Sequence, residues 1–176
     1  KGSNIFLKQV SHQTSYPMRM SRGLDSFNRE KKFRKIESVC KNLDFNTDFH
    51  KIHYDNIWVS NAHKELSKQL KKMLNLEHLK DLEFENVKPG PAIANTIASD
   101  FGTIELNIQK NIKIIQLALK SYLEIFSMYK TFTDSTGAKN NLLLIYNGRF
   151  LHERALWDCA KNIGQDFLIY ENTRNR

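Results

Sequence analysis

Cysteine, proline and glycine are scarce in this sequence, with two, three and seven of them among 176 residues. Cys40 and Cys159 are far apart, and Cys159 falls on an apolar helical face. We therefore expect a free buried thiol and a reducing, cytoplasmic compartment rather than a disulfide framework. Lysine, glutamine and glutamate interrupt the longest apolar stretch every few residues, and the N-terminus lacks the apolar core of a signal peptide. These absences predict a soluble chain that contacts a membrane at most peripherally.

Local motifs for nucleotide and metal chemistry are also missing. The chain contains no P-loop, no G-x-G-x-x-G, no serine-hydrolase elbow and no kinase motif set. Its six histidines show no metal-like spacing, and His50 and His53 would need a third ligand that no nearby cysteine supplies. We therefore expect neither a metal nor a cofactor.

Positive charge is in excess, with 27 basic and 19 acidic residues, a net charge of +8 and a pI near 9.5. Such a field suits nucleic acid, an anionic membrane surface or phosphorylated small molecules. The basic residues gather at 29–35 and on a helix that carries Lys64, Lys68, Lys71 and Lys72. A solvated helix face explains these runs equally well, so charge alone does not choose a partner.

The first half of the chain, 1–89, has the mixed periodicity of an α/β region. Its expected elements are a strand at 4–10, a loop at 11–22, a helix at 25–43, one or two strands at 49–60, a helix at 62–74 capped by Asn61, and an edge strand at 79–87. We expect this region and 90–176 to form one domain.

Lys88-Pro89-Gly90-Pro91 is the strongest breaker in the chain and predicts a hinge or a binding loop. The mixed stretch after it holds Ser99 and Asp100, which either cap the next helix or meet a ligand. That helix, expected over 104–132, has an apolar stripe so broad that it requires burial on more than one side. A central domain helix accounts for this better than a coiled-coil dimer, because strict heptads are absent.

The tail predicts a βαβ unit. Two short apolar runs at 142–146 and 167–170 flank an amphipathic helix, and Gly164 stands where its C-terminal cap belongs. The runs are apolar throughout, as in parallel strands buried on both faces. Such a sheet binds ligands at the carboxyl ends of its strands, beside helix N-termini.

Several polar residues fall at that end of the expected sheet. Arg149 can bind phosphate or carboxylate with its forked guanidinium, or it can form an ion pair with Glu153 or Glu171. Glu171 can act as a general base, as an acceptor for sugar hydroxyls or as a structural partner of an arginine. The full set of ligand-binding candidates is Asn147, Gly148, Arg149, His152, Glu153, Arg154, Ser99 and Asp100, with Glu171 as the catalytic candidate. Turn formation by Asn147, backbone geometry at Gly148, helix-dipole stabilisation by Glu153 and a plain surface position for His152 are the structural alternatives.

The string Asn147-Gly148-Arg149-Phe150, followed by Glu153-Arg154-Ala155, Ala160, Gly164 and Glu171, resembles a signature of bacterial capsular-polysaccharide-type glycosyltransferases. In that family the signature closes the N-terminal Rossmann-like domain of a two-domain enzyme. The match covers the tail and, more loosely, the helix before it, and leaves most of 1–89 uncovered. Asn172 stands where the family is expected to have a glycine after the glutamate, which puts the loop conformation in doubt.

The resemblance implies an α/β, Rossmann-like three-layer domain with a mostly parallel sheet, one half of a two-Rossmann-domain (GT-B-like) enzyme. It implies a saccharide acceptor, a nucleotide-sugar donor held mainly by a missing C-terminal domain, and a cytoplasmic place that can include the inner-membrane surface. A chain of this length then represents the acceptor-side half, inert without its partner domain. The alternative from charge is a basic, non-enzymatic module for nucleic acid or another anionic partner, and the lack of aromatic–basic interleaving speaks against nucleic acid.

Overall fold

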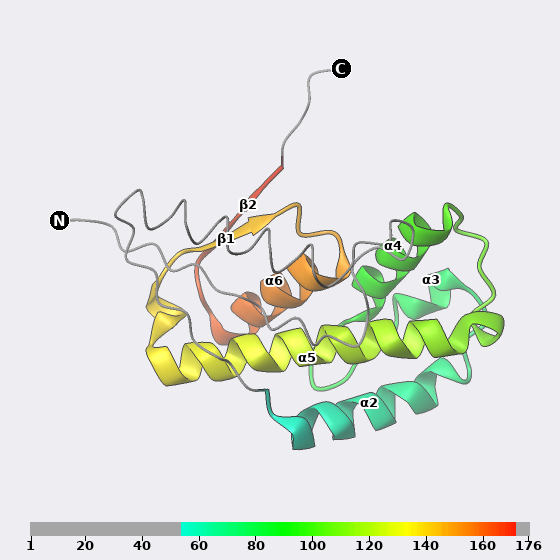
Figure 1. Ribbon diagram of the computed structural model, residues 1–176, viewed down its shortest axis with the longest axis horizontal. Coiled ribbons are helices and arrows are strands. Elements are labelled where there is room, and N and C mark those ends of the chain that lie inside the picture. The colour runs from blue at the N-terminus through cyan, green and yellow to red at the C-terminus, as the bar shows by residue number, and fades with distance from the viewer. Residues whose placement is uncertain (1–53, 172–176) are drawn as a thin grey trace, which may run out of the picture. The chain divides into compact units, whose positions relative to one another are not determined.

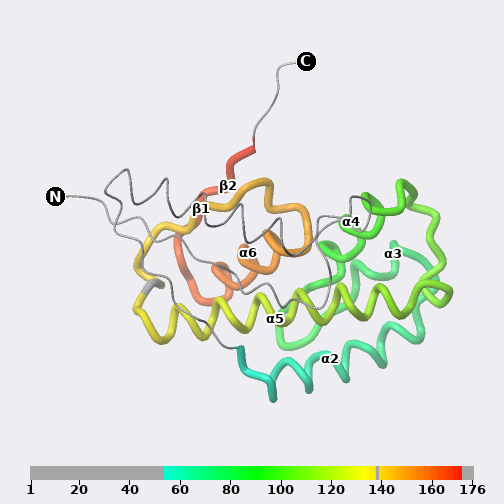
Figure 2. The backbone as a smooth tube through the Cα atoms, in the orientation of Figure 1, coloured from blue at the N-terminus to red at the C-terminus, as the bar shows by residue number. Residues whose placement is uncertain are grey.

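The computed structural model describes residues 54–171, which belong to one compact unit. The elements expected at 4–10, 11–22 and 25–43, the part of the expected strand region at 49–53, the basic run at 29–35 and Cys40 lie outside these residues. Figure 1 shows the described elements as ribbons and Figure 2 follows the same backbone as a tube. In chain order they are α2 (Asn56–Leu70), α3 (Leu76–Leu79), α4 (Gly90–Phe101), η2 (Gln109–Asn111), α5 (Ile112–Thr136), η3 (Ala138–Asn140), β1 (Leu143–Tyr146), α6 (Leu151–Ile163) and β2 (Phe167–Tyr170).

Helix α5 is the centre of this unit. It contacts α2 on one side and both α4 and α6 on the other (Figure 1). Residues 121–128 are all buried, so more than two consecutive turns face protein in every direction. This confirms the central domain helix expected from its broad apolar stripe. Because α2 precedes residue 89 and α5 follows it, their contact joins the described part of the first half to the second half of the chain.

The βαβ tail is confirmed. Strands β1 and β2 pair in parallel, with Leu143 opposite Phe167 and Tyr146 opposite Tyr170. Helix α6 connects them and ends at Gly164, whose φ of 69° is left-handed. The described part of the chain is thus mixed α and β, with a two-stranded parallel sheet.

One face of this small sheet is open, contrary to the expectation of strands buried on both faces. Ile145 is 2% exposed, whereas Leu144, Tyr146, Leu168 and Tyr170 are all about half exposed. Apolar composition alone predicted burial on both faces, but within the described residues only the face toward α6 is covered.

Three expectations for the first half are wrong. Residues 56–60 are helical, because Asp55 accepts hydrogen bonds from the backbone of Ile57 and Trp58 and starts α2 six residues before Asn61. Stacking of Trp58 on Phe126 of α5, with ring centroids 5.5 Å apart, favours this helix over the expected strand. The stretch 79–87 contains the end of α3 and a tight turn between Phe84 and Val87 instead of an edge strand.

The Pro-Gly-Pro breaker also has a different role from the one expected. It begins α4, since proline in the first helical turn loses no intrahelical hydrogen bond. Helix α4 therefore includes Ser99 and Asp100, and α5 begins at Ile112 rather than near residue 104. Gly90 is required at this point because a Cβ there would lie 1.5 Å from the Leu79 carbonyl oxygen. Its missing side chain lets α4 start directly against α3.

None of the helices within 54–171 has the length and apolar character needed to cross a membrane.

Candidate functional site

The chain turns sharply where β1 ends. Asn147 and Gly148 both adopt left-handed φ values, 68° and 64°, which asparagine and glycine tolerate better than other residues. The Asn147 N–H donates to the Tyr170 carbonyl (2.9 Å) and so continues the pairing with β2. A Cβ on Gly148 would lie 3.1 Å from Cδ1 of Ile169, so this glycine serves both conformation and close packing. The turn delivers Arg149 to the carboxyl end of the sheet.

Arg149 brings the predicted residues together. Its Nε donates to Oδ1 of Asn147 (3.0 Å), and its guanidinium forms an ion pair with Glu171, which follows β2. We call these three residues the polar edge. The side chains of Arg149 and Glu171 are 63% and 41% exposed, so the pair is open to solvent. Of the two ion pairs considered from the sequence, Arg149 forms the one with Glu171.

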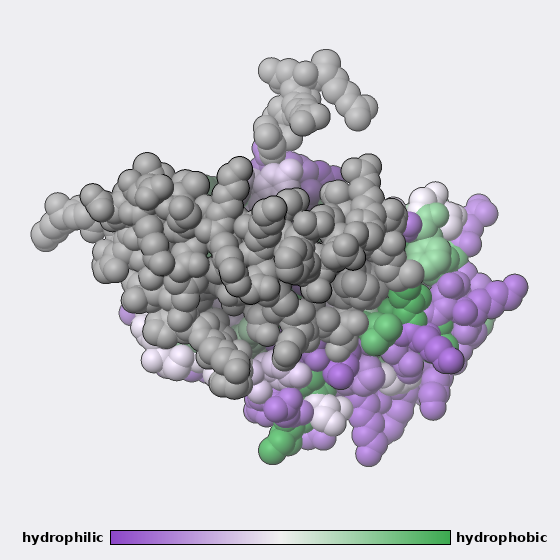
Figure 3. All heavy atoms as spheres, viewed as in Figure 1, coloured by the Kyte–Doolittle hydropathy of each residue, from purple (hydrophilic) through white to green (hydrophobic). Residues whose placement is uncertain are grey.

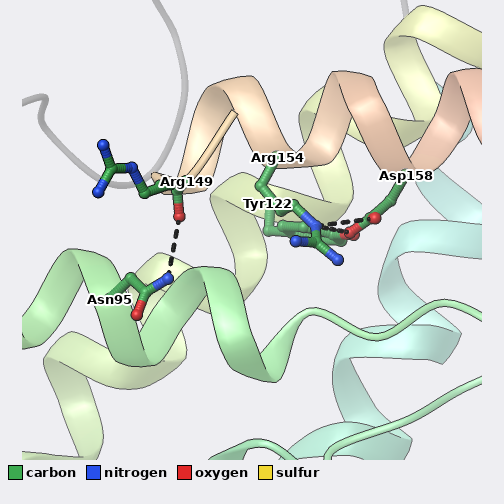
Figure 4. A network of polar contacts seen from close by, with 5 residues as sticks. All are labelled: Asn95, Tyr122, Arg149, Arg154 and Asp158. Atoms are coloured by element: carbon green, nitrogen blue, oxygen red, sulfur yellow. Dashed lines mark hydrogen bonds and ion pairs between the residues drawn. The ribbon is translucent and has the colours of Figure 1, made fainter. Parts of the chain in front are cut away.

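The start of α6 lies beside this edge. Its N-cap residue, Phe150, offers no side-chain hydrogen bond, and Oγ1 of Thr96 on α4 accepts from the Leu151 N–H instead (2.9 Å). Nδ2 of Asn95 donates to the Arg149 carbonyl (3.4 Å), while the Arg149 side chain points away from α4 (Figure 4). Asn95 and Thr96 thus contact the α6 start, and the sequence pattern did not indicate either, because the mixed stretch that holds them had no element assigned to it.

Glu153 and His152 occupy the first turn of α6 and are half-buried. Burial raises the pKa of the Glu153 carboxyl, and a hydrogen bond from its own backbone N–H opposes that rise in part. A carboxylate in the first turn also interacts favourably with the helix dipole, but the net rise means that burial outweighs the favourable contacts and disfavours the ionised form.

The Arg154 side chain binds residues of α6 next to α5 rather than those of the polar edge. Its Nε lies 2.9 and 3.0 Å from the two carboxylate oxygens of Asp158, and its guanidinium lies 4.1 Å from the Trp157 ring centroid. Tyr122 of α5, which is fully buried, donates its hydroxyl to the same carboxylate (2.6 Å; Figure 4). Arg154 therefore joins a network that holds α6 against α5.

Ser99 and Asp100 lie in the last turn of α4, Ser99 exposed and Asp100 half-buried. Ser99 follows Asn95 by one helical turn and shares its face. The hydrogen bonds from α4 to the polar-edge segment described above come from the earlier Asn95 and Thr96. Because Ser99 and Asp100 lie inside α4, they do not cap the next helix, and their role in ligand binding stays a prediction.

Chemically, the polar edge combines a carboxylate, a guanidinium and an amide. These groups can accept from and donate to hydroxyls, and the guanidinium can also bind an anion in a bidentate manner. The rings of Tyr146 and Tyr170 lie next to one another on the open sheet face, with centroids 5.5 Å apart. Among residues 54–171, no three His, Cys, Asp or Glu side chains are grouped so that they could hold a metal ion.

Comparison with protein-family models, with curated proteins and with solved structures gave no match. The geometry of the site and the sequence pattern therefore carry the functional argument.

Proposed function

We propose that this chain is the acceptor-side domain of a bacterial glycosyltransferase that moves a sugar from a nucleotide sugar to a growing surface polysaccharide. The observation that supports this most is the polar edge, where Asn147, Arg149 and Glu171 meet at the carboxyl ends of two parallel strands. Ligands bind at this position in open α/β sheets. The signature resemblance falls on the same residues.

Glu171 is the catalytic residue of this proposal. A carboxylate can take the proton from an acceptor hydroxyl as that hydroxyl attacks the donor sugar. Arg149 orients the Glu171 carboxylate through their ion pair, and Asn147 orients Arg149 in turn. The half-exposed rings of Tyr146 and Tyr170 lie on the neighbouring sheet face and offer an apolar surface to the C–H face of a sugar ring.

A complete Rossmann-like domain is part of the proposal as well. A Rossmann-like three-layer domain has helices on both faces of its sheet, and the open face of β1 and β2 is where a further layer would lie. In the proposed GT-B-like enzyme the second Rossmann domain holds most of the donor nucleotide. The chain alone is then inert, cytoplasmic, and able to contact an anionic inner-membrane surface through exposed lysines such as Lys64, Lys71 and Lys72 on and after α2.

A binding screen tests the proposal. The full chain, Arg149→Ala, Glu171→Gln and the control Lys113→Ala are compared by ligand-observed NMR against nucleotide sugars, capsular oligosaccharides and a short oligonucleotide. Lys113 is exposed at the start of α5, so its replacement removes one positive charge away from the polar edge. We expect saccharide or nucleotide-sugar binding that Arg149→Ala abolishes and Lys113→Ala leaves unchanged.

The alternative function is a basic binding module for nucleic acid or another anion, which the exposed lysines on and after α2 and the net charge of +8 favour. It predicts oligonucleotide binding that weakens steeply with salt and is equally sensitive to Lys113→Ala and Arg149→Ala. That result, with no saccharide binding, would replace the glycosyltransferase proposal.

A further inference from the structure

A second candidate site lies beside the polar edge, in a pocket between α3, α4 and the segment 104–107. Its volume is about 530 Å³, within the range typical of ligand sites. We call it the α3–α4 pocket. Apolar groups line part of it, including Ala94 and Ala98 of α4 and Ile104, which is 78% exposed. Figure 3 shows hydrophobic residues among hydrophilic ones at the side of the molecule where α4 lies in Figure 1.

Hydrogen bonds to main-chain groups fix the walls of this pocket. Asn75 and Asn107 form an antiparallel bridge, and the Ile108 N–H donates to the Leu74 carbonyl (3.0 Å). Nε2 of Gln109 donates to the carbonyls of Leu70 (3.0 Å) and Met73 (2.7 Å). The segment 104–109 is thereby tied to the end of α2 and the start of α3, so the pocket exists before any ligand arrives.

Half of the polar side chains in the lining are amides, and each has a hydrogen-bonding group left over. Oδ1 of Asn75 accepts from the His78 N–H (3.2 Å) and Oδ1 of Asn107 accepts from the Lys110 N–H (3.0 Å), which leaves both Nδ2 groups as donors. In Asn95 the amide nitrogen is bound to the Arg149 carbonyl, which leaves Oδ1 as an acceptor. A pocket that offers donors and acceptors together suits hydroxyl groups, because each hydroxyl does both.

The charges of the pocket disfavour an anionic ligand. Glu77 is paired with Lys80 (2.6 Å), and the remaining charged group in the lining is the carboxylate of Glu105. The lining therefore carries one net negative charge in a chain that is strongly basic elsewhere. A phosphate or a nucleotide would meet a carboxylate here, whereas a neutral hydroxylated ligand would gain an acceptor.

We infer that the α3–α4 pocket binds a neutral stretch of the saccharide chain, as a subsite for the acceptor; this rests on the proposed function. Asn95 connects the two sites, since it lines the pocket and its amide also contacts the backbone of Arg149. A saccharide held here along the apolar groups of Ala94, Ala98 and Ile104 lies next to the segment that carries the polar edge.

Side-chain amide signals of the full ¹⁵N-labelled chain test this directly. The Nδ2 resonances of Asn75, Asn95 and Asn107 are followed during titration with maltotriose, cellotriose and tri-N-acetylchitotriose, and with UDP-glucose and inorganic phosphate as anionic probes. We expect at least one neutral trisaccharide to shift all three signals, and phosphate to shift none. Ala98→Trp fills the pocket and should abolish this binding, whereas Leu117→Trp on the exposed side of α5 should not.

Glu105→Gln tests the same site without added volume, because this side chain is exposed and its replacement keeps the shape. Loss of a charged acceptor should weaken trisaccharide binding about tenfold. Shifts confined to the segment around Arg149, unaffected by Ala98→Trp, would overturn the pocket and leave the proposed function standing. The pocket proposal would also be overturned by stronger shifts with phosphate or UDP-glucose than with neutral sugars, or by the absence of a shift with any trisaccharide. The comparison with Arg149→Ala tests the proposed function separately.

Discussion

The network of Tyr122, Asp158 and Arg154 should be the most sensitive polar feature of the α5–α6 contact. Tyr122 is fully buried, and its hydroxyl donates to Asp158 over 2.6 Å. Burial, followed by the charge of Asp158, raises the pKa of Tyr122 well above its usual value, so the hydroxyl stays a donor. Asp158→Ala leaves that hydroxyl without an acceptor, at a cost of about 1–3 kcal/mol, and removes a partly buried ion pair worth about 1 kcal/mol.

We therefore expect Asp158→Ala to lower the free energy of unfolding by about 3 kcal/mol, or to lower Tm by roughly 6–12 °C in a chain of this size. Tyr122→Phe keeps the ion pair and should cost only about 1 kcal/mol. Once Asp158 is alanine, Tyr122→Phe removes an unsatisfied hydroxyl and should be neutral or slightly stabilising. The two variants must then couple by about 1–2 kcal/mol in a double-mutant cycle.

Urea unfolding, followed by far-UV circular dichroism, measures the free energy of unfolding of each variant. The values can be compared if the m-value is unchanged. Tyr129→Phe is the matched control, because Tyr129 also lies on α5 and donates to the neutral Gln165 (2.8 Å). Its cost should add to that of Asp158→Ala without coupling. Additive costs for Tyr122→Phe and Asp158→Ala would refute the reasoning, since they would show that the hydroxyl is not held by this carboxylate.

Three further changes test the backbone and the charge of the site. Gly90→Ala should abolish cooperative thermal unfolding, because the new Cβ would stand 1.5 Å from a carbonyl oxygen of α3; a normal melting curve would contradict the close approach. Gly148→Ala should destabilise the chain more than Gly137→Ala. Both glycines have a left-handed φ, so either substitution costs about 1–2 kcal/mol of backbone strain, but of the two only Gly148 has neighbours within 4 Å of an added Cβ. Equal losses of stability would argue against that contact. Burial raises the pKa of Glu153 above its usual value. The folded state therefore binds more protons at this carboxyl than the unfolded state does, and stability falls as pH rises from the unfolded pKa through the folded one. Glu153→Gln should lack this loss and be the more stable chain near neutral pH, as urea titrations at several pH values would show.

The tail was predictable because its signals are local. Alternation of short apolar runs with one amphipathic helix, closed by Gly164, leaves few topologies other than a parallel βαβ unit. The meeting of Arg149 and Glu171 follows from that topology, because parallel strands end at the same edge. The choice of partner for Arg149 did not follow, since Glu153 lies much nearer in sequence, at the start of the same helix, and was an equally plausible partner.

The first half was mispredicted where tertiary contacts outweigh local preference. Ile57, Trp58 and Val59 have the composition of a strand, yet Asp55 caps a helix there and Trp58 stacks on α5. Pro89 reads as a breaker, although at a helix start it costs nothing and Gly90 beside it is needed for packing. The α3–α4 pocket lies between two helices that meet at Gly90, and the sequence pattern did not predict this contact.

Exposure decides how the ion pair of Arg149 and Glu171 should be understood. With side chains 63% and 41% exposed, the pair is screened by solvent and contributes at most about 1 kcal/mol to stability. The fold is held mainly by its apolar core, to which the partly buried network of Tyr122, Asp158 and Arg154 and the Thr96 contact with the start of α6 add. Because the polar edge adds little to folding, a variant such as Arg149→Ala can lose its ligand and keep its Tm. If Arg149→Ala instead unfolds the chain with a loss as large as that of Asp158→Ala, the arginine is structural and the polar edge is not a ligand site.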